Sequence, residues 1–106
     1  MRFGLEEKTL AKLNSIFARH KNIDKVLIYG SRAKGTWKAG SDIDLVLQGQ
    51  NVTLSCLHTL NQEIDDLLLP YTVDTTLDHL ITNEGLRDHI NRIGHVLYTR
   101  GESDPP

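Results

Sequence analysis

Cysteine is almost absent from this chain, in which Cys56 is the single example among 106 residues. An internal disulfide is therefore impossible, and a reducing cytoplasm is the expected compartment. The first residues lack the apolar stretch of a signal peptide, and no apolar run is long enough to span a bilayer. Repeats, internal linkers and low-complexity tracts are also lacking. We therefore expect one domain over residues 1–100, followed by a polar, proline-ended tail at 101–106 that is disordered.

Basic side chains are scarce in the second part of the chain. Residues 1–41 carry nine Lys/Arg and three Asp/Glu, whereas residues 42–106 carry three Lys/Arg and eleven Asp/Glu. This division either reflects chance in a small protein or indicates that the basic part meets an anionic ligand while some of the acidic residues hold metal. Charge alone does not decide between these two interpretations.

Apolar residues in this sequence alternate between helical spacing and short continuous runs. The patterns and their flanking residues predict a helix over about residues 6–20, strands at 26–29 and 43–47, a helix from 54 to 68 that Pro70 stops, a strand at 71–77, a helix between Asn83 and Gly94, and a short strand at 96–98. Because strands and helices alternate, the expected fold class is α/β or α+β, with a small mixed sheet covered by helices.

The pair Gly30-Ser31 directly follows the first predicted strand. Glycine at a strand end lets the backbone bend and lets a ligand approach closely. If Ser31 opens a short helical turn, its amide and hydroxyl lie where an anion would bind. The next basic residues, Arg32, Lys34 and Lys38, either face phosphate oxygens or are solvated loop charges, and for Lys38 the second interpretation is favoured.

Asp42 and Asp44 begin the second predicted strand. Residues two apart in a strand point to the same face, so the two carboxylates are expected side by side. Such a pair is tolerated where a divalent cation lies between the charges, and hard oxygen ligands favour Mg²⁺ or Mn²⁺ over zinc. The alternative is an ordinary turn, with Asp44 on an exposed face.

A third carboxylate, Asp74, lies within the third predicted strand. If that strand pairs beside the strand of Asp42 and Asp44, the three carboxylates would form a two-metal site. Asp74 is then also a candidate general base for an acceptor hydroxyl. The alternative is a polar residue on an exposed strand face.

The remaining chemically active side chains give weaker signals. The five histidines show no spacing typical of a zinc site. His89 and His95 lie on or near the last predicted helix, and we expect both at its surface. Trp37 could stack on a nucleobase, but packing onto the domain is the favoured interpretation.

The residues described above resemble the motif of a known superfamily. The Gly-Ser pair, the ten-residue gap, Asp-Ile-Asp and a later third aspartate are similar to those of the DNA polymerase β-like nucleotidyltransferases. Within that superfamily, the short chain and the segment YGSRAKGTWKAGSDIDLVL resemble the minimal nucleotidyltransferases (MNT) of bacteria and archaea. The likeness extends over about residues 5–100 and implies the polymerase β-like fold.

This resemblance implies roles for particular residues. Gly30 and Ser31 would bind the triphosphate of ATP, Asp42 and Asp44 would ligate two Mg²⁺ ions, and Asp74 would be the third carboxylate. MNT proteins are commonly paired with a small helical HEPN protein, an RNase toxin that they neutralise by transferring AMP from ATP to a tyrosine. The resemblance therefore implies a Mg²⁺-dependent antitoxin of this kind. We expect no membrane partner and no direct nucleic-acid binding.

Two other functions remain open at this point. The protein either neutralises its partner by docking alone, with little use of its carboxylates, or transfers nucleotides to a small molecule or an RNA end. No second segment remains to hold an acceptor, which counts against the last function. We therefore expect another chain to provide the acceptor.

Overall fold

Helices and strands alternate along residues 1–100, the part of the chain that the computed structural model describes. The expected disordered tail, residues 101–106, lies outside it. In chain order the elements are α1 (Glu7–Arg19), β1 (Lys25–Tyr29), α2 (Gly30–Lys34), β2 (Ile43–Gln48), α3 (Leu54–Asp65), β3 (Val73–Leu77), the 3₁₀ turn η1 (Asp78–Leu80), α4 (Glu84–Ile93) and β4 (His95–Thr99). Each predicted helix and strand is therefore present, and the expected α+β class is confirmed.

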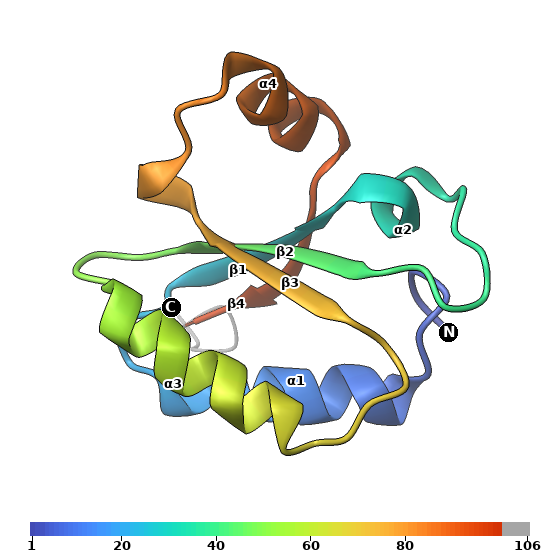
Figure 1. The fold of residues 1–106 in the computed structure, drawn as a ribbon, viewed down its shortest axis with the longest axis horizontal. Helices are drawn as coiled ribbons and strands as arrows, with labels where there is room; N and C mark the ends of the chain where they lie inside the picture. The colour runs from blue at the N-terminus through green and yellow to red at the C-terminus, as the bar shows by residue number, and fades with distance from the viewer. Residues whose placement is uncertain (101–106) are drawn as a thin grey trace, which may run out of the picture.

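The four strands form one mixed sheet in the order β3-β2-β1-β4. β1 runs antiparallel to both β2 and β4, whereas β2 and β3 are parallel. Helices α1 and α3 cover one face of this sheet, and α4 lies over the other, with α2 projecting from the end of β1 (Figure 1). The parallel pair needs a crossover, which α3 provides.

The continuous apolar run of β1 is explained by burial on both faces of the sheet. Val26 and Ile28 belong to the main core with α1 and α3. Tyr29, the next residue along, packs with Val46 and with Ile90 of α4 in a second cluster. The second cluster attaches α4 to the sheet at the end of β1, where the Gly30-Ser31 turn begins.

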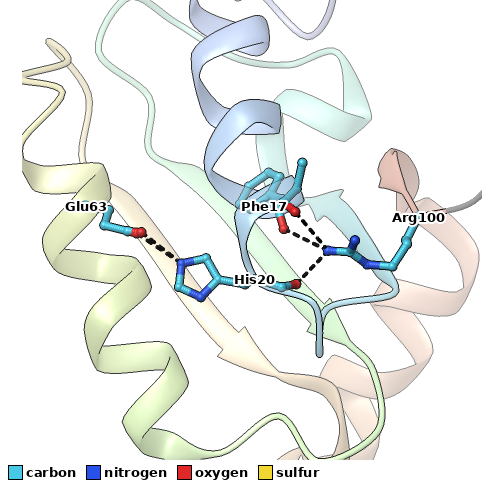
Figure 2. A network of polar contacts seen from close by, with 5 residues as sticks. Phe17, His20, Glu63 and Arg100 are labelled. Carbon is cyan, nitrogen blue, oxygen red and sulfur yellow. Dashed lines mark hydrogen bonds and ion pairs between the residues drawn. The ribbon is translucent and has the colours of Figure 1, made fainter.

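Polar contacts fasten the end of α1 to α3 and to the end of β4 (Figure 2). His20 Nε2 lies 2.9 Å from Glu63 Oε1 on α3. The guanidinium of Arg100 donates hydrogen bonds to the carbonyls of Phe17, Ala18 and His20. The carbonyls of Phe17 and His20 also accept from the backbone amides of His20 and Ile23, so Arg100 adds a second partner there and ties the C-terminal end of α1 to the end of β4.

The helix predicted over residues 54–68 is shorter than its apolar pattern suggests. α3 ends at Asp65, and Leu68 adopts φ +54° with its side chain 86% exposed. The chain therefore leaves the helix before Pro70, and the last repeats of the pattern belong to the connection to β3.

Within the described residues, every helix is too short or too polar to cross a bilayer.

Candidate functional site

Asp44 and Asp74 occupy paired positions on two neighbouring parallel strands. Asp44 of β2 is the register partner of Asp74 of β3. Register partners project from the same face of a sheet. Val46, two positions after Asp44 in β2, projects from that face as well and packs with Ile90 of α4, so the face lies toward α4. The condition set by the sequence, that the strand of Asp74 pair beside the strand of Asp44, is therefore met.

Asp42 lies just before β2 begins and is exposed, as is Asp74, whereas Asp44 is half-buried. Asp42 and Asp44 are two positions apart, with Ile43 between them, so strand alternation directs both to the same face. Among residues 1–100, however, no three His, Cys, Asp or Glu side chains lie close enough together to form a group that could hold a metal ion. The carboxylates share a face and an end of the sheet without forming a closed ligand cage.

The charges on this face affect one another. Burial raises the pKa of Asp44, and the charges of Asp74 and Asp42 raise it further, whereas His89 acts in the opposite direction. A raised carboxyl pKa means that the ionised form is disfavoured, here by burial first and then by the neighbouring carboxylates. The chemistry of these donors fits a divalent cation even though they do not form a closed group, because hard carboxylate oxygens are the ligands that Mg²⁺ prefers and a cation would offset their repulsion.

Gly30 is required by the position of Asp44. Its φ is +73°, a conformation that residues with a side chain rarely adopt, and an added Cβ would overlap Asp44 Oδ2. The backbone of the turn therefore lies directly against the carboxylate. Ser31 is the second residue of α2, so the short helical turn on which its predicted role depends is present.

Arg32 does not face the site that the sequence suggested for it. Its side chain is 2% exposed, and the guanidinium donates hydrogen bonds to the carbonyl of Ser41 and, at 3.0 Å, to that of Phe3. It also lies 4.8 Å above the ring of Tyr71. Because the guanidinium is buried and donates to backbone carbonyls, Arg32 fixes the loop that precedes Asp42 and is not exposed as a phosphate-binding residue would be.

The other residues of this loop lie at the surface. Lys34, at the end of α2, is exposed, and so is Lys38. Trp37 is 39% exposed, and its indole packs against Gly4, where an added Cβ would overlap the ring. The expectation that Trp37 packs onto the domain is therefore confirmed. The exposed side chain of Lys34 leaves its predicted contact with phosphate open, and Lys38, for which the sequence favours a solvated loop charge, is equally accessible.

Two residues near the carboxylates were missed by the sequence analysis. His89, expected at the surface, is half-buried, and its Nε2 accepts a hydrogen bond from the Gly30 amide at 3.1 Å. Tyr29 is 8% exposed, and burial raises the pKa of its phenol; Asp44 and Asp74 add to the rise, while a hydrogen bond with Thr76 opposes it. The helical spacing of Leu86, His89 and Ile90 was the available signal for His89.

These features have the arrangement that the resemblance to nucleotidyltransferases implies. The family of this chain can be given more closely. The family model described as Polymerase beta, Nucleotidyltransferase matches residues 11–103, so the chain belongs to that family. The expected resemblance to the polymerase β-like superfamily is confirmed. No curated protein matches the chain in a sequence comparison.

Solved structures with the same fold include components of toxin–antitoxin complexes. A toxin–antitoxin complex with AMP-PNP contains a chain of 21% identity and TM-score 0.68, with 90% of this chain and 74% of that one covered. The structure of a tri-AMPylated HEPN toxin of Shewanella oneidensis in complex with an MNT antitoxin contains a chain of 15% identity and TM-score 0.67. The match covers 94% of this chain and 77% of that one. A candidate nucleotidyltransferase of Sulfolobus solfataricus is 19% identical with a TM-score of 0.56. The match covers 93% of this chain and 94% of that one.

Proposed function

We propose that this protein is an MNT antitoxin that transfers AMP from ATP to a hydroxyl group, a tyrosine of a HEPN-family toxin. The observation that carries the proposal is the pairing of Asp44 with Asp74 beside the Gly30-Ser31 turn. Membership of a nucleotidyltransferase family supports the class of reaction. The shared fold with the antitoxin of an AMPylated HEPN toxin supports the choice of acceptor.

Asp42, Asp44 and Asp74 would hold the two Mg²⁺ ions of such an enzyme. When bound, the metal neutralises charge on the triphosphate and on the leaving pyrophosphate. The chain itself contributes the turn at Gly30-Ser31 to receive the triphosphate. Lys34, exposed at the end of α2, is placed after that turn and would meet phosphate oxygens as a point charge.

The proposed step is an in-line displacement at the α-phosphorus of ATP. The acceptor oxygen forms a bond to that phosphorus while the bond to the bridging oxygen of pyrophosphate breaks. The hydroxyl proton passes to Asp74, which is exposed at the edge strand β3 and therefore open to an acceptor from another chain. Orientation of the two reactants on one face of the sheet provides most of the acceleration.

Two forms of labelled ATP test this reaction. The purified chain, a HEPN-family partner encoded beside it and Mg²⁺ are incubated with ATP labelled at either the α- or the γ-phosphate. Nucleotidyl transfer places the α-label on the partner and leaves the γ-label in pyrophosphate. Transfer of the γ-label would instead indicate phosphoryl transfer, and absence of both labels would contradict the proposal.

Matched variants assign the activity to the site. Asp44→Asn and Asp74→Asn remove a charge at the paired positions, and we expect each to lower the initial rate at least a hundredfold. Asp66→Asn makes the same chemical change at an exposed position at the end of α3, and its rate should equal that of the unaltered protein. If all three variants reacted at the rate of the unaltered protein, Asp44 and Asp74 would not be needed for the reaction.

A further inference from the structure

His89 connects the C-terminal helix to the turn beside the carboxylates. It lies on α4, 59 residues from its hydrogen-bond partner, the Gly30 amide. Its ring also meets Tyr29 edge-on, with the centroids 6.0 Å apart. Because Tyr29 and Gly30 are the last residue of β1 and the first of α2, His89 is fixed against the point where the strand becomes the turn.

The bond from Gly30 defines the form of the imidazole. An amide N–H donates, so Nε2 must present its lone pair, and in a neutral ring the hydrogen is then on Nδ1. Gly30 is at the start of α2, where a backbone N–H has no partner within the helix. The imidazole therefore satisfies a donor that the local backbone cannot satisfy.

The position of Gly30 in turn limits the position of Asp44. A Cβ at Gly30 would overlap Asp44 Oδ2, so the carboxylate rests against the Gly30 backbone. A change of a few tenths of an ångström in this peptide would move the surface on which the carboxylate lies. His89 is thus linked to Asp44 through the Gly30 peptide.

We infer that His89 is a positioning residue, whose Nε2 holds the Gly30 peptide and thereby places the turn and Asp44 for the nucleotide. The inference rests on the proposed function in that the nucleotide is ATP. The residue needs no contact with ATP for this role. What the role requires is a hydrogen-bond acceptor at the end of a side chain that reaches Gly30 from α4.

Two variants separate the acceptor from the bulk of the side chain. In His89→Gln the side-chain carbonyl can accept the bond from Gly30, whereas His89→Met has a similar reach and lacks a comparable acceptor. His58→Met provides a matched control, since His58 is an exposed residue of α3, which covers the opposite face of the sheet. Circular dichroism and urea unfolding of each variant establish that the fold is retained.

The first measurement is the Kd of AMP-PNP with Mg²⁺ by isothermal titration calorimetry. We expect His89→Met to raise Kd about tenfold, a loss matching one hydrogen bond, and His89→Gln to stay within about threefold of the unaltered protein. A His89→Met protein that binds as the unaltered one does would overturn the inference. So would a His89→Gln protein that binds as weakly as His89→Met.

The second measurement does not depend on nucleotide binding. Amide hydrogen exchange at Gly30, followed by NMR, should be slow in the unaltered protein and in His89→Gln and at least tenfold faster in His89→Met. Equal exchange in His89→Met and in the unaltered protein would show that His89 does not hold Gly30. If the unaltered protein fails to bind AMP-PNP while exchange follows this pattern, the proposed function fails and the positioning of Gly30 stands.

Discussion

Asp44 and Asp74 are register partners on parallel strands, so two carboxylates extend side by side from one face of the sheet. Like charges at directly opposed positions destabilise a sheet. The apo protein keeps this pair at a cost, which is typical of residues retained for binding or chemistry. The carboxylate pair therefore gives measurable consequences for stability as well as for activity.

Replacement of Asp44 by Asn is expected to stabilise the metal-free protein at pH 7. Burial, and then the charges of Asp74 and Asp42, raise the pKa of this carboxyl. A carboxyl with a raised folded-state pKa costs the folded state stability once ionised, and the cost appears as pH rises from the ordinary value of 3.8 through the raised value. Because the group is partly exposed, we expect a gain of about 0.5–1 kcal/mol at pH 7.

Urea unfolding in EDTA at pH 7 and at pH 3 measures this effect. The gain of Asp44→Asn over the unaltered protein should vanish at pH 3, where the carboxyl is protonated in both the folded and the unfolded state. Asp66→Asn, at the exposed end of α3, should change stability little at either pH. A variant less stable than the unaltered protein at pH 7 would contradict the electrostatic account.

Magnesium is expected to stabilise the protein through the same carboxylates. A ligand present at ten times its Kd adds about 1.4 kcal/mol to the free energy of unfolding. Thermal unfolding with Mg²⁺, compared with NaCl at equal ionic strength, should therefore show a higher midpoint for the unaltered protein. Asp44→Asn should lose most of that increase. An equal increase in both proteins would indicate binding elsewhere.

Two glycine substitutions separate backbone strain from the close approach of Asp44. Gly30 and Gly35 both adopt positive φ, +73° and +84°, but an added Cβ at Gly35 has no atom within 4 Å. Gly35→Ala should therefore cost only the backbone term, about 1 kcal/mol. Gly30→Ala should cost about 1–2 kcal/mol more, because the carboxylate of Asp44 must move.

A double-mutant cycle checks the origin of that difference. In an Asp44→Ala background, Gly30→Ala should cost about as much as Gly35→Ala does, because the overlapping carboxylate is gone. Denaturant unfolding provides all four free energies. An unchanged cost of Gly30→Ala in that background would show that the carboxylate is not the obstacle.

Arg32→Met is expected to destabilise the protein by about 2–4 kcal/mol. The substitution leaves the partly buried carbonyls of Ser41 and Phe3 without these donors, and an unsatisfied buried group costs about 1–3 kcal/mol. Lys34→Met, at an exposed position nearby, should change stability by less than about 0.5 kcal/mol.

Denaturant unfolding and AMP-PNP titration distinguish this role from phosphate binding. If Arg32 contacted phosphate, Arg32→Met would keep its stability and lose affinity. In that case its profile would match the one expected for Lys34→Met.

Local sequence patterns were sufficient for the four strands and for α1, α3 and α4, because each has its own apolar pattern or capping residue, but they did not predict α2 or η1. They were insufficient at the end of α3, where the apolar spacing continues through Leu67 and Leu68 but the backbone turns before Pro70. Helix periodicity reports which positions are apolar. Periodicity does not indicate where the helix must end so that the chain can reach the start of the next strand.

The part of the site that depends on local geometry was predictable, and the part that depends on contacts distant in sequence was not. Asp42 and Asp44 share a face through local geometry alone, whereas their relation to Asp74 depends on which strands pair. The direction of Arg32 could not be read from its neighbours, because an inward guanidinium depends on carbonyls supplied by Ser41 and by the distant Phe3. His89 meets Gly30 from a helix far along the chain, so the contact exists only in the folded protein.

Intact-mass spectrometry of the HEPN-family partner tests the central claim most directly. The partner is co-expressed with the unaltered chain, with Asp44→Asn or with Asp66→Asn, and each complex is purified and weighed. The account predicts added AMP units with the unaltered chain and with Asp66→Asn, and an unmodified partner with Asp44→Asn. A partner of unmodified mass in all three complexes, or the same added mass with Asp44→Asn, would contradict it.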